Sequence, residues 1–207
     1  NTAEYSILNS GGVFAYSAIA WSPVGNLVGA AVGSAVMMYD VTTNRSLTVA
    51  AAGPTITDFA FSPDGKYVVT SQYYEDTVLN TGEVIKVVHV YEVDENQLGD
   101  IITMPVFTIP NQGGGDIAWS PDGRQLVVLE HDGILVYNVE TESMQQIPFA
   151  ADSLYTLDWS PDGFRLATGG SVIRVWDTQT WHIMLEIPVA GGADELAWSQ
   201  NGDRIYH

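Results

Sequence analysis

Apolar and polar residues alternate along most of this chain in short runs, and each run is bounded by a turn signal. The run LYTLDW at residues 154–159 alternates with the period of two that is typical of a β-strand. Two further strands are predicted at 165–170 (RLATGG) and 172–176 (VIRVW), and the more polar segment MLEIPVA follows at 184–190. We therefore predict a unit of four short antiparallel strands.

The turn between the first two predicted strands recurs five times. Its copies are AWSPVG, AFSPDG, AWSPDG, DWSPDG and AWSQNG, and their serines are separated by 40, 58, 40 and 39 residues. An aromatic residue inside a second mark follows each of the first four turns, in the order MMYD, HVYE, LVYN and RVWD. Two marks that recur in phase indicate an internal repeat.

The residues of the turn have separate physical roles. Proline presets φ, aspartate tolerates the next position, and glycine accepts the positive φ that closes the hairpin. A single four-stranded sheet cannot bury both of its faces, but a stack of such sheets can. We therefore predict that the aromatic residue before each turn packs between neighbouring sheets, with a stacking platform for a ligand as the alternative. These residues are Trp21, Phe61, Trp119, Trp159 and Trp198.

The SPDG hairpin and the RVWD-like ending of the third strand resemble the WD40-type blade of a β-propeller. The resemblance covers nearly the whole chain and implies an all-β propeller of about five four-stranded antiparallel blades in a single domain, 1–207. The expected blades are 13–50, 51–110, 111–150, 151–190, and 191–207 together with 1–12. SPDG also occurs in TolB-like propellers, whereas RVWD at 174–177 favours the WD40 side. No Gly-His pair precedes the first strand of a blade, so the buried Asp-His-Ser/Thr-Trp network of that family is not carried over.

The second repeat is 18 residues longer than its neighbours. One insertion lies around 71–84 and the other around 94–104. In a WD40-like propeller the first insertion falls in the loop between the second and third strands, on the face that usually binds partners. Extra length in one loop often carries function, so we predict a partner-contact patch here, with a longer strand pair ending in a polar tip as the alternative. The patch comprises Tyr73, Tyr74, Glu75 and Asp76.

The two ends of the chain predict one composite, incomplete blade. Residues 3–12 (AEYSILNSGG) resemble a fourth strand, and 194–207 supply only the first two strands. An incomplete blade leaves strand edges that invite pairing with another chain. Three explanations stay open: a longer protein with more blades, a ring closed by a three-stranded blade, or a neighbouring subunit that supplies the missing strand.

The charge of the chain narrows the choice of partners. Twenty-five acidic residues face seven basic ones, for a formal net charge of −18. Such a surface repels nucleic-acid phosphates and anionic lipid headgroups, and no apolar run is long enough to span a membrane. We therefore expect a protein partner, no nucleic acid and no membrane insertion. The acidity and scarce lysine favour an extracellular or cell-surface location, with the cytoplasm as the alternative.

The sequence contains no recognisable catalytic or metal-binding motif. Its four histidines show no close metal-ligand spacing, and no nucleophile elbow or phosphate-binding loop is present. We therefore expect no enzyme activity, cofactor or metal. The predicted role is a non-catalytic interaction scaffold, concretely a self-assembling subunit of an extracellular polymer in which copies complete the open blade. The alternatives are a ligand- or sugar-binding module and a propeller hydrolase or lyase with acidic residues at one mouth of the channel.

Overall fold

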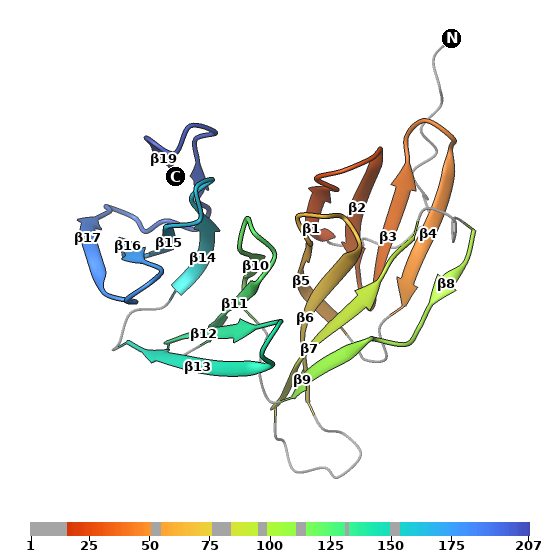
Figure 1. Cartoon of the computed structure of the whole chain (residues 1–207), viewed down its shortest axis with the longest axis horizontal. Coiled ribbons are helices and arrows are strands. Elements are labelled where there is room, and N and C mark those ends of the chain that lie inside the picture. Colours follow the sequence, from red (N-terminus) through yellow and green to blue (C-terminus); the bar gives the residue numbers. More distant parts are fainter. Residues whose placement is uncertain are drawn as a thin grey trace.

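The computed structural model describes residues 16–50, 55–75, 84–94, 99–110, 115–130, 133–149 and 154–207. The regular elements in these ranges are β-strands, which form five sheets. None of the described residues belongs to a helix long and apolar enough to cross a membrane. Figure 1 shows the sheets following one another in chain order along an arc, and each sheet is called a blade below.

Blade 1 has a fifth strand, β8, which comes from the second repeat. Blade 1 consists of β1 (Tyr16–Trp21), β2 (Leu27–Val32), β3 (Ala35–Asp40), β4 (Arg45–Ala50) and, at its outer edge, β8 (Ile101–Ile102). Blade 2 consists of β5 (Thr55–Phe61), β6 (Tyr67–Glu75), β7 (Val84–Glu92) and β9 (Phe107–Pro110).

The remaining blades follow in simple order. Blade 3 consists of β10 (Ile117–Trp119), β11 (Gln125–Glu130), β12 (Gly133–Asn138) and β13 (Ser143–Pro148). Blade 4 consists of β14 (Leu154–Trp159), β15 (Arg165–Gly170), β16 (Val172–Asp177) and β17 (Ile183–Pro188). Blade 5 contains the two strands β18 (Ala197–Trp198) and β19 (Ile205–Tyr206).

The predicted all-β architecture of four-stranded antiparallel sheets is confirmed, with one difference at blade 1. The second insertion, 94–104, leaves blade 2 and returns along β4, where β8 pairs in parallel through Thr48 with Ile101 and Val49 with Ile102. Gly99 N donates to Ser46 O across 2.7 Å at the start of this pairing. The insertion thus covers an outer edge that would otherwise expose unpaired backbone groups.

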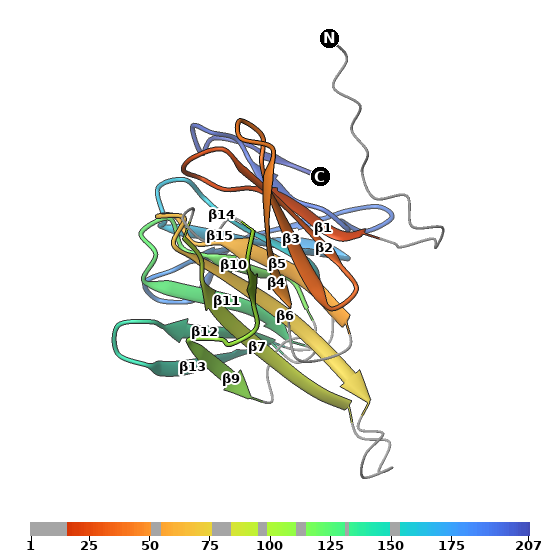
Figure 2. The ribbon, with the colours of Figure 1, turned by 90° about the vertical axis from the view of Figure 1, so that its right-hand side faces the viewer.

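The first strand of every blade lies on the inside of the arc. β1 contacts β5, β5 contacts β10, β10 contacts β14, and β14 contacts β18. In Figure 1 the sheets lie beside one another along the arc, and Figure 2 gives the same ribbon turned by 90°. This arrangement places each sheet face against the next blade.

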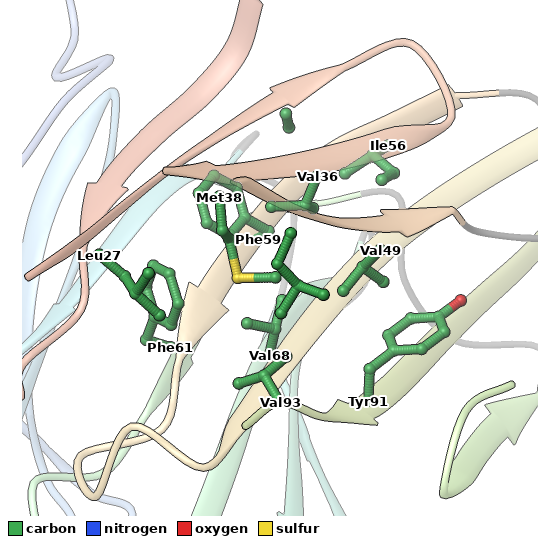
Figure 3. Packing of buried hydrophobic residues seen from close by; sticks show 12 residues of the cluster. Leu27, Val36, Met38, Val49, Ile56, Phe59, Phe61, Val68, Tyr91 and Val93 are labelled. Carbon is green, nitrogen blue, oxygen red and sulfur yellow. The ribbon is translucent and has the colours of Figure 1, made fainter. Parts of the chain in front are cut away.

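Apolar clusters between the blades form the core. Between blades 1 and 2, Met38 and Leu27 face Phe59 and Phe61, whose rings meet edge to face at 5.9 Å and 74° (Figure 3). Burying each such side chain contributes roughly 1.5–3 kcal/mol. Gly29 permits this contact, because a Cβ there would lie 2.8 Å from the ring of Phe59. Similar clusters join blade 2 to blade 3 and blade 3 to blade 4.

Candidate functional site

Each SPDG motif builds the same hydrogen-bonded hairpin between the first two strands of its blade. In blade 2, Ser62 Oγ donates to Asp64 Oδ1 across 2.6 Å and accepts from Tyr67 N at 2.9 Å, while Gly65 has a φ of 71°. Blades 3 and 4 repeat the serine–aspartate bond with Ser120 and Asp122 at 2.6 Å and with Ser160 and Asp162 at 2.5 Å. A positive φ favours glycine, so each hairpin has a defined shape at the edge of the blade.

A groove of about 760 Å³ lies between the hairpins of blades 2 and 3. Four aromatic residues line it: Tyr67, Phe107, Trp119 and Tyr137. The rings of Phe107 and Tyr137 are stacked, with centroids 5.5 Å apart and an interplanar angle of 29°. Trp119 is 8% exposed, and its Nε1 is buried without a hydrogen-bond partner. The groove therefore offers aromatic surface, and the buried indole N–H of Trp119 has no hydrogen-bond partner.

Acidic residues complete the lining of this groove. They are Asp64 and Asp122 from the two hairpins and Glu142 from the turn between β12 and β13. The residues described as lining the groove include no lysine, arginine or histidine. Burial raises the pKa of Tyr137, and the negative charge of Glu142 raises it further. The groove is thus both aromatic and negatively charged.

The outward face of blade 1 is a second candidate surface. Two cross-strand rows form it: Ile19–Ala30–Met37–Thr48 and Trp21–Val28–Tyr39–Ser46. Ile19, Trp21 and Tyr39 are 75%, 64% and 43% exposed. The equivalent row of blade 2 begins Phe61–Val68–Tyr91 and is buried against blade 1. A contiguous exposed apolar surface of this kind is typical of an interaction site.

The aromatic residues before the turns differ in burial along the arc. Phe61, Trp119 and Trp159 are buried in the clusters between blades. Trp198 is half-buried and donates from Nε1 to Asp158 O across 3.1 Å. Trp21 departs from the prediction of packing between sheets, because blade 1 is the end of the arc in the described structure and leaves the ring exposed.

The predicted contact patch lies at the far end of a long hairpin. The backbone of Tyr73, Tyr74 and Glu75 forms the last part of β6 and pairs with residues 84–86 of β7. Figure 2 shows this hairpin projecting beyond the neighbouring strands. Asp76 lies outside the described residues, and the role of the patch in binding stays a prediction.

Three aspartates connect consecutive blades, and our sequence analysis did not single them out. Asp58 and Asp158 lie on the inner strands β5 and β14, and Asp116 directly precedes β10. Their Oδ2 atoms accept backbone N–H groups of the next blade: Asp58 from Ile117 at 3.0 Å, Asp116 from Leu157 at 2.7 Å and Asp158 from Trp198 at 2.7 Å. Burial and the neighbouring Asp116 carboxyl raise the pKa of Asp58 well above its usual value. The signal in the sequence is the shared position of Asp58 and Asp116, four residues before the hairpin serine.

The inner aspartates bear on the hydrolase or lyase alternative, which requires acidic residues that converge at the channel. Each of these three carboxylates accepts a backbone N–H of the next blade, and the Asp58 and Asp116 carboxyls also interact with one another, so the alternative stays a prediction. In the described part of the chain, no group of three histidine, aspartate or glutamate side chains is arranged to hold a metal ion. His89 is half-buried, and its Nδ1 lies 2.8 Å from Thr108 Oγ1.

The family model described as "WD domain, G-beta repeat" matches residues 44–79 and 144–177. The second matched segment starts in β13, the outer strand of blade 3, and ends with β16, the third strand of blade 4. Within it, Trp176 Nε1 donates to Thr168 Oγ1 across 3.0 Å. This bond is the Trp–Thr half of the network that the sequence did not allow us to carry over.

Two solved structures share the fold. Hydrazine synthase of Kuenenia stuttgartiensis matches with a TM-score of 0.72 and 16% identity, over 91% of this chain and 66% of that chain. The β-propeller domain of Cps50 (Swd1) from Myceliophteria thermophila matches with a TM-score of 0.70 and 11% identity, over 92% of this chain and 60% of that chain. At these identities the likeness establishes the β-propeller fold alone. The chain spans less than two thirds of either similar structure.

Proposed function

Because the chain is a WD40-repeat β-propeller, we propose that it is a non-catalytic scaffold for protein–protein interaction. The observation that carries this proposal is the exposed apolar face of blade 1. Trp21 and Tyr39 occupy positions there that the inner blades bury against a neighbour. A surface built like an inter-blade contact but left exposed is suited to binding another protein.

The more specific proposal is that copies of the chain bind one another. The far end of the arc also exposes apolar side chains, since Leu185 and Ile187 of β17 are 50% and 40% exposed in the blade beside the two-stranded blade 5. A contact between the two different ends of the arc is heterologous, and repeated heterologous contacts form rings or open filaments. The two end surfaces thus support the self-assembling subunit predicted from the sequence.

Light scattering after size-exclusion chromatography tests this proposal at protein concentrations from about 1 to 100 μM. We expect the average mass to rise with concentration and Trp21→Glu to return it to that of a monomer. Phe164→Glu is the matched control, because Phe164 is 60% exposed on the hairpin of blade 4 and not on the face of blade 1. A wild-type chain that stays monomeric throughout contradicts self-assembly.

We also propose that the protein acts outside the cell or at its surface, with the cytoplasm as the alternative. The support is compositional: 25 acidic against seven basic residues, and two lysines in the whole chain. Fractionation of the producing cells, with detection by an antibody to the full chain, tests this location. Recovery of all the protein from the soluble cell interior contradicts it.

A further inference from the structure

The groove between blades 3 and 4 is filled by the chain itself. Trp181, from the turn between β16 and β17, is 9% exposed and meets the ring of Trp159 edge to face, with centroids 6.3 Å apart and an angle of 80°. The backbone of Trp181 has a φ of 56°. One indole side chain from the turn is therefore enough to close an inter-blade groove in this fold.

The equivalent turn of blade 3 carries a different residue. Glu142 occupies the same turn position with a φ of 55°, and Thr141 N bonds to Asn138 Oδ1 just as Thr180 N bonds to Asp177 Oδ1. Glu142 lines the groove between blades 2 and 3 rather than filling it. The space that an indole occupies in one groove is thus open in the preceding one.

The open groove also contains a buried polar group that lacks a partner. Trp119 Nε1 is buried and makes no hydrogen bond, whereas Trp198 Nε1 has a backbone acceptor. Trp159 Nε1 is unpartnered too, but there Trp181 packs against the ring. Of these indoles, Trp119 lines an open groove, where a carbonyl oxygen of a bound ligand would satisfy its N–H.

The negative charge of the groove favours positively charged ligands over negatively charged ones. Asp64, Asp122 and Glu142 contribute carboxylates to the lining, and the basic side chains nearby are Lys66, 3.9 Å from Asp64, and Arg124, which pairs with Glu140 at 3.3 Å. Cations are attracted both to carboxylates and to the faces of aromatic rings. An anionic ligand would meet repulsion from all three acids.

We infer that this groove binds a peptide segment of a partner protein that presents a tryptophan or phenylalanine side chain flanked by lysine or arginine. The aromatic side chain takes the place that Trp181 takes in the next groove. Its basic neighbours lie against the acidic lining, and a peptide carbonyl accepts from Trp119 Nε1. This inference rests on the proposed scaffold function and names the chemistry of one partner.

Isothermal titration calorimetry with three capped pentapeptides tests the inference. The peptides are Gly-Lys-Trp-Lys-Gly, Gly-Glu-Trp-Glu-Gly and Gly-Lys-Ala-Lys-Gly, each titrated into the full chain at low salt. We expect the first peptide to bind at least about tenfold more tightly than either of the others, because it alone combines the aromatic ring with positive charge. Equal affinities, or no binding of the first peptide at millimolar concentration, overturn the inference.

A variant that closes the groove gives the sharper test. Glu142→Trp copies the arrangement of Trp181, so we expect it to fold, to keep or raise the melting temperature and to abolish binding of the Lys-Trp-Lys peptide. Asn44→Trp is the matched control, since Asn44 occupies the same turn position in blade 1 with a φ of 59° and does not line the groove. Unchanged peptide binding by folded Glu142→Trp overturns the inference.

A second variant examines the unpartnered donor. Trp119→Phe keeps an aromatic ring and removes Nε1, and we expect it to weaken peptide binding several-fold. Light scattering of the same samples keeps the two proposals separate. Loss of peptide specificity with intact self-association refutes only the groove, whereas monomeric protein that binds the peptide refutes only self-assembly.

Discussion

Trp21 and Trp159 occupy the same position of the repeat and have different surroundings. Trp159 is 6% exposed in the cluster between blades 3 and 4, while Trp21 is 64% exposed on blade 1. Both residues end the first strand of a blade and pair with an apolar residue of the second strand, Val28 or Leu166, although the turn after Trp21 has Val24 where the turn after Trp159 has Asp162. The difference in burial follows from the presence or absence of a neighbouring sheet in the described structure. The contribution of such a ring to stability therefore depends on its blade.

Truncation of these two residues has unequal predicted costs. Trp159→Ala is expected to lower the free energy of unfolding by about 3–5 kcal/mol, because it leaves a cavity between blades. Trp21→Ala is expected to cost less than about 1 kcal/mol in the monomer, since the ring is mostly in solvent. Urea denaturation of both variants in dilute solution measures the difference. Similar losses for the two variants contradict this assignment of their environments.

Asp58 gives a prediction about pH. Burial and the Asp116 carboxyl raise the folded-state pKa of Asp58 above the value of about 3.9 expected in the unfolded chain. Between these two values the folded state holds more protons, so its stability falls as the pH rises. Asp58→Asn retains an acceptor for Ile117 N and removes this titration. We expect the stability of the variant relative to wild type to increase from pH 4 to pH 8 in urea denaturation.

Asp162 is a control for Asp58, because its pKa is shifted in the opposite direction. The hydrogen bond from Ser160 and backbone bonds lower the pKa of Asp162, so its ionised form favours the folded state above the unfolded pKa. Asp162→Asn should therefore lose more stability relative to wild type at pH 7 than at pH 3. A pH-independent difference for both variants contradicts the assigned shifts.

Local sequence predicted the hairpins but not the state of the grooves. Ser, Pro, Asp and Gly fix the turn by near-neighbour bonds, so their geometry follows from the motif. Trp181 belongs to a cluster that joins blades 3 and 4, and Glu142 lines the groove between blades 2 and 3, so the surroundings of both residues include another blade. The alternation of apolar and polar residues along the chain does not reveal a contact between two blades. The inner aspartates escaped notice for the same reason, because their partners lie one blade away.

Among the strands, β8 has the least predictable position. Two residues of an insertion in the second repeat pair with β4 of blade 1. They add an edge strand to the sheet of the preceding blade. Gly99 makes the approach with a φ of 110° and a bond to Ser46 O. Its conformation is one that other residues rarely adopt. The insertion therefore joins two blades at their outer edges.

Loss of this glycine should expose the edge of β4. Gly99→Ala is expected to weaken the pairing of β8, because alanine disfavours this φ by about 1 kcal/mol or more. Hydrogen exchange should then increase in residues 45–50 while the inner strands remain protected. Gly191→Ala is the control, since its φ of 97° imposes similar strain and a Cβ there would meet no atom within 4 Å. Equal exchange of β4 in the two variants contradicts the role of β8.

The long second repeat shows how far element prediction reaches. β6 and β7 have nine residues each, in agreement with the longer strand pair that the sequence analysis kept as an alternative. Alternating apolar residues mark strands wherever they occur, so the hairpin was predictable. The parallel pairing of β8 was not, because two residues carry no periodic signal.

At the scale of the whole molecule, net charge opposes association. Each copy carries a formal −18, so two copies repel at low ionic strength even where their apolar faces fit. We expect the mass measured by light scattering to rise as sodium chloride increases from about 10 to 500 mM, because salt shortens the screening length from roughly 30 Å to a few ångströms. Dissociation on adding salt indicates an interface held by ion pairs instead.

The propeller architecture was predictable because its information is repeated. Five copies of one turn and four of one strand ending are hard to mistake, and each copy forms its contacts with an equivalent neighbour. The exposure of Trp21 was not predicted, because the repeat sequence is the same whether or not another sheet packs against that face of blade 1. The number and spacing of the repeats thus predict that the blades stack. The burial of a given residue depends in addition on whether its blade has a neighbour on that side.

The offset between the matched segments and the blades has a consequence for how such a chain grows. The segment 144–177 contributes the outer strand of blade 3 and the first three strands of blade 4. If a gene segment with these boundaries is duplicated, its first strand completes the blade before it and its other three strands begin a new blade. Each strand then has a sheet to join. Whole repeats can therefore be gained or lost during evolution while each repeat segment still supplies the outer strand of the blade before it.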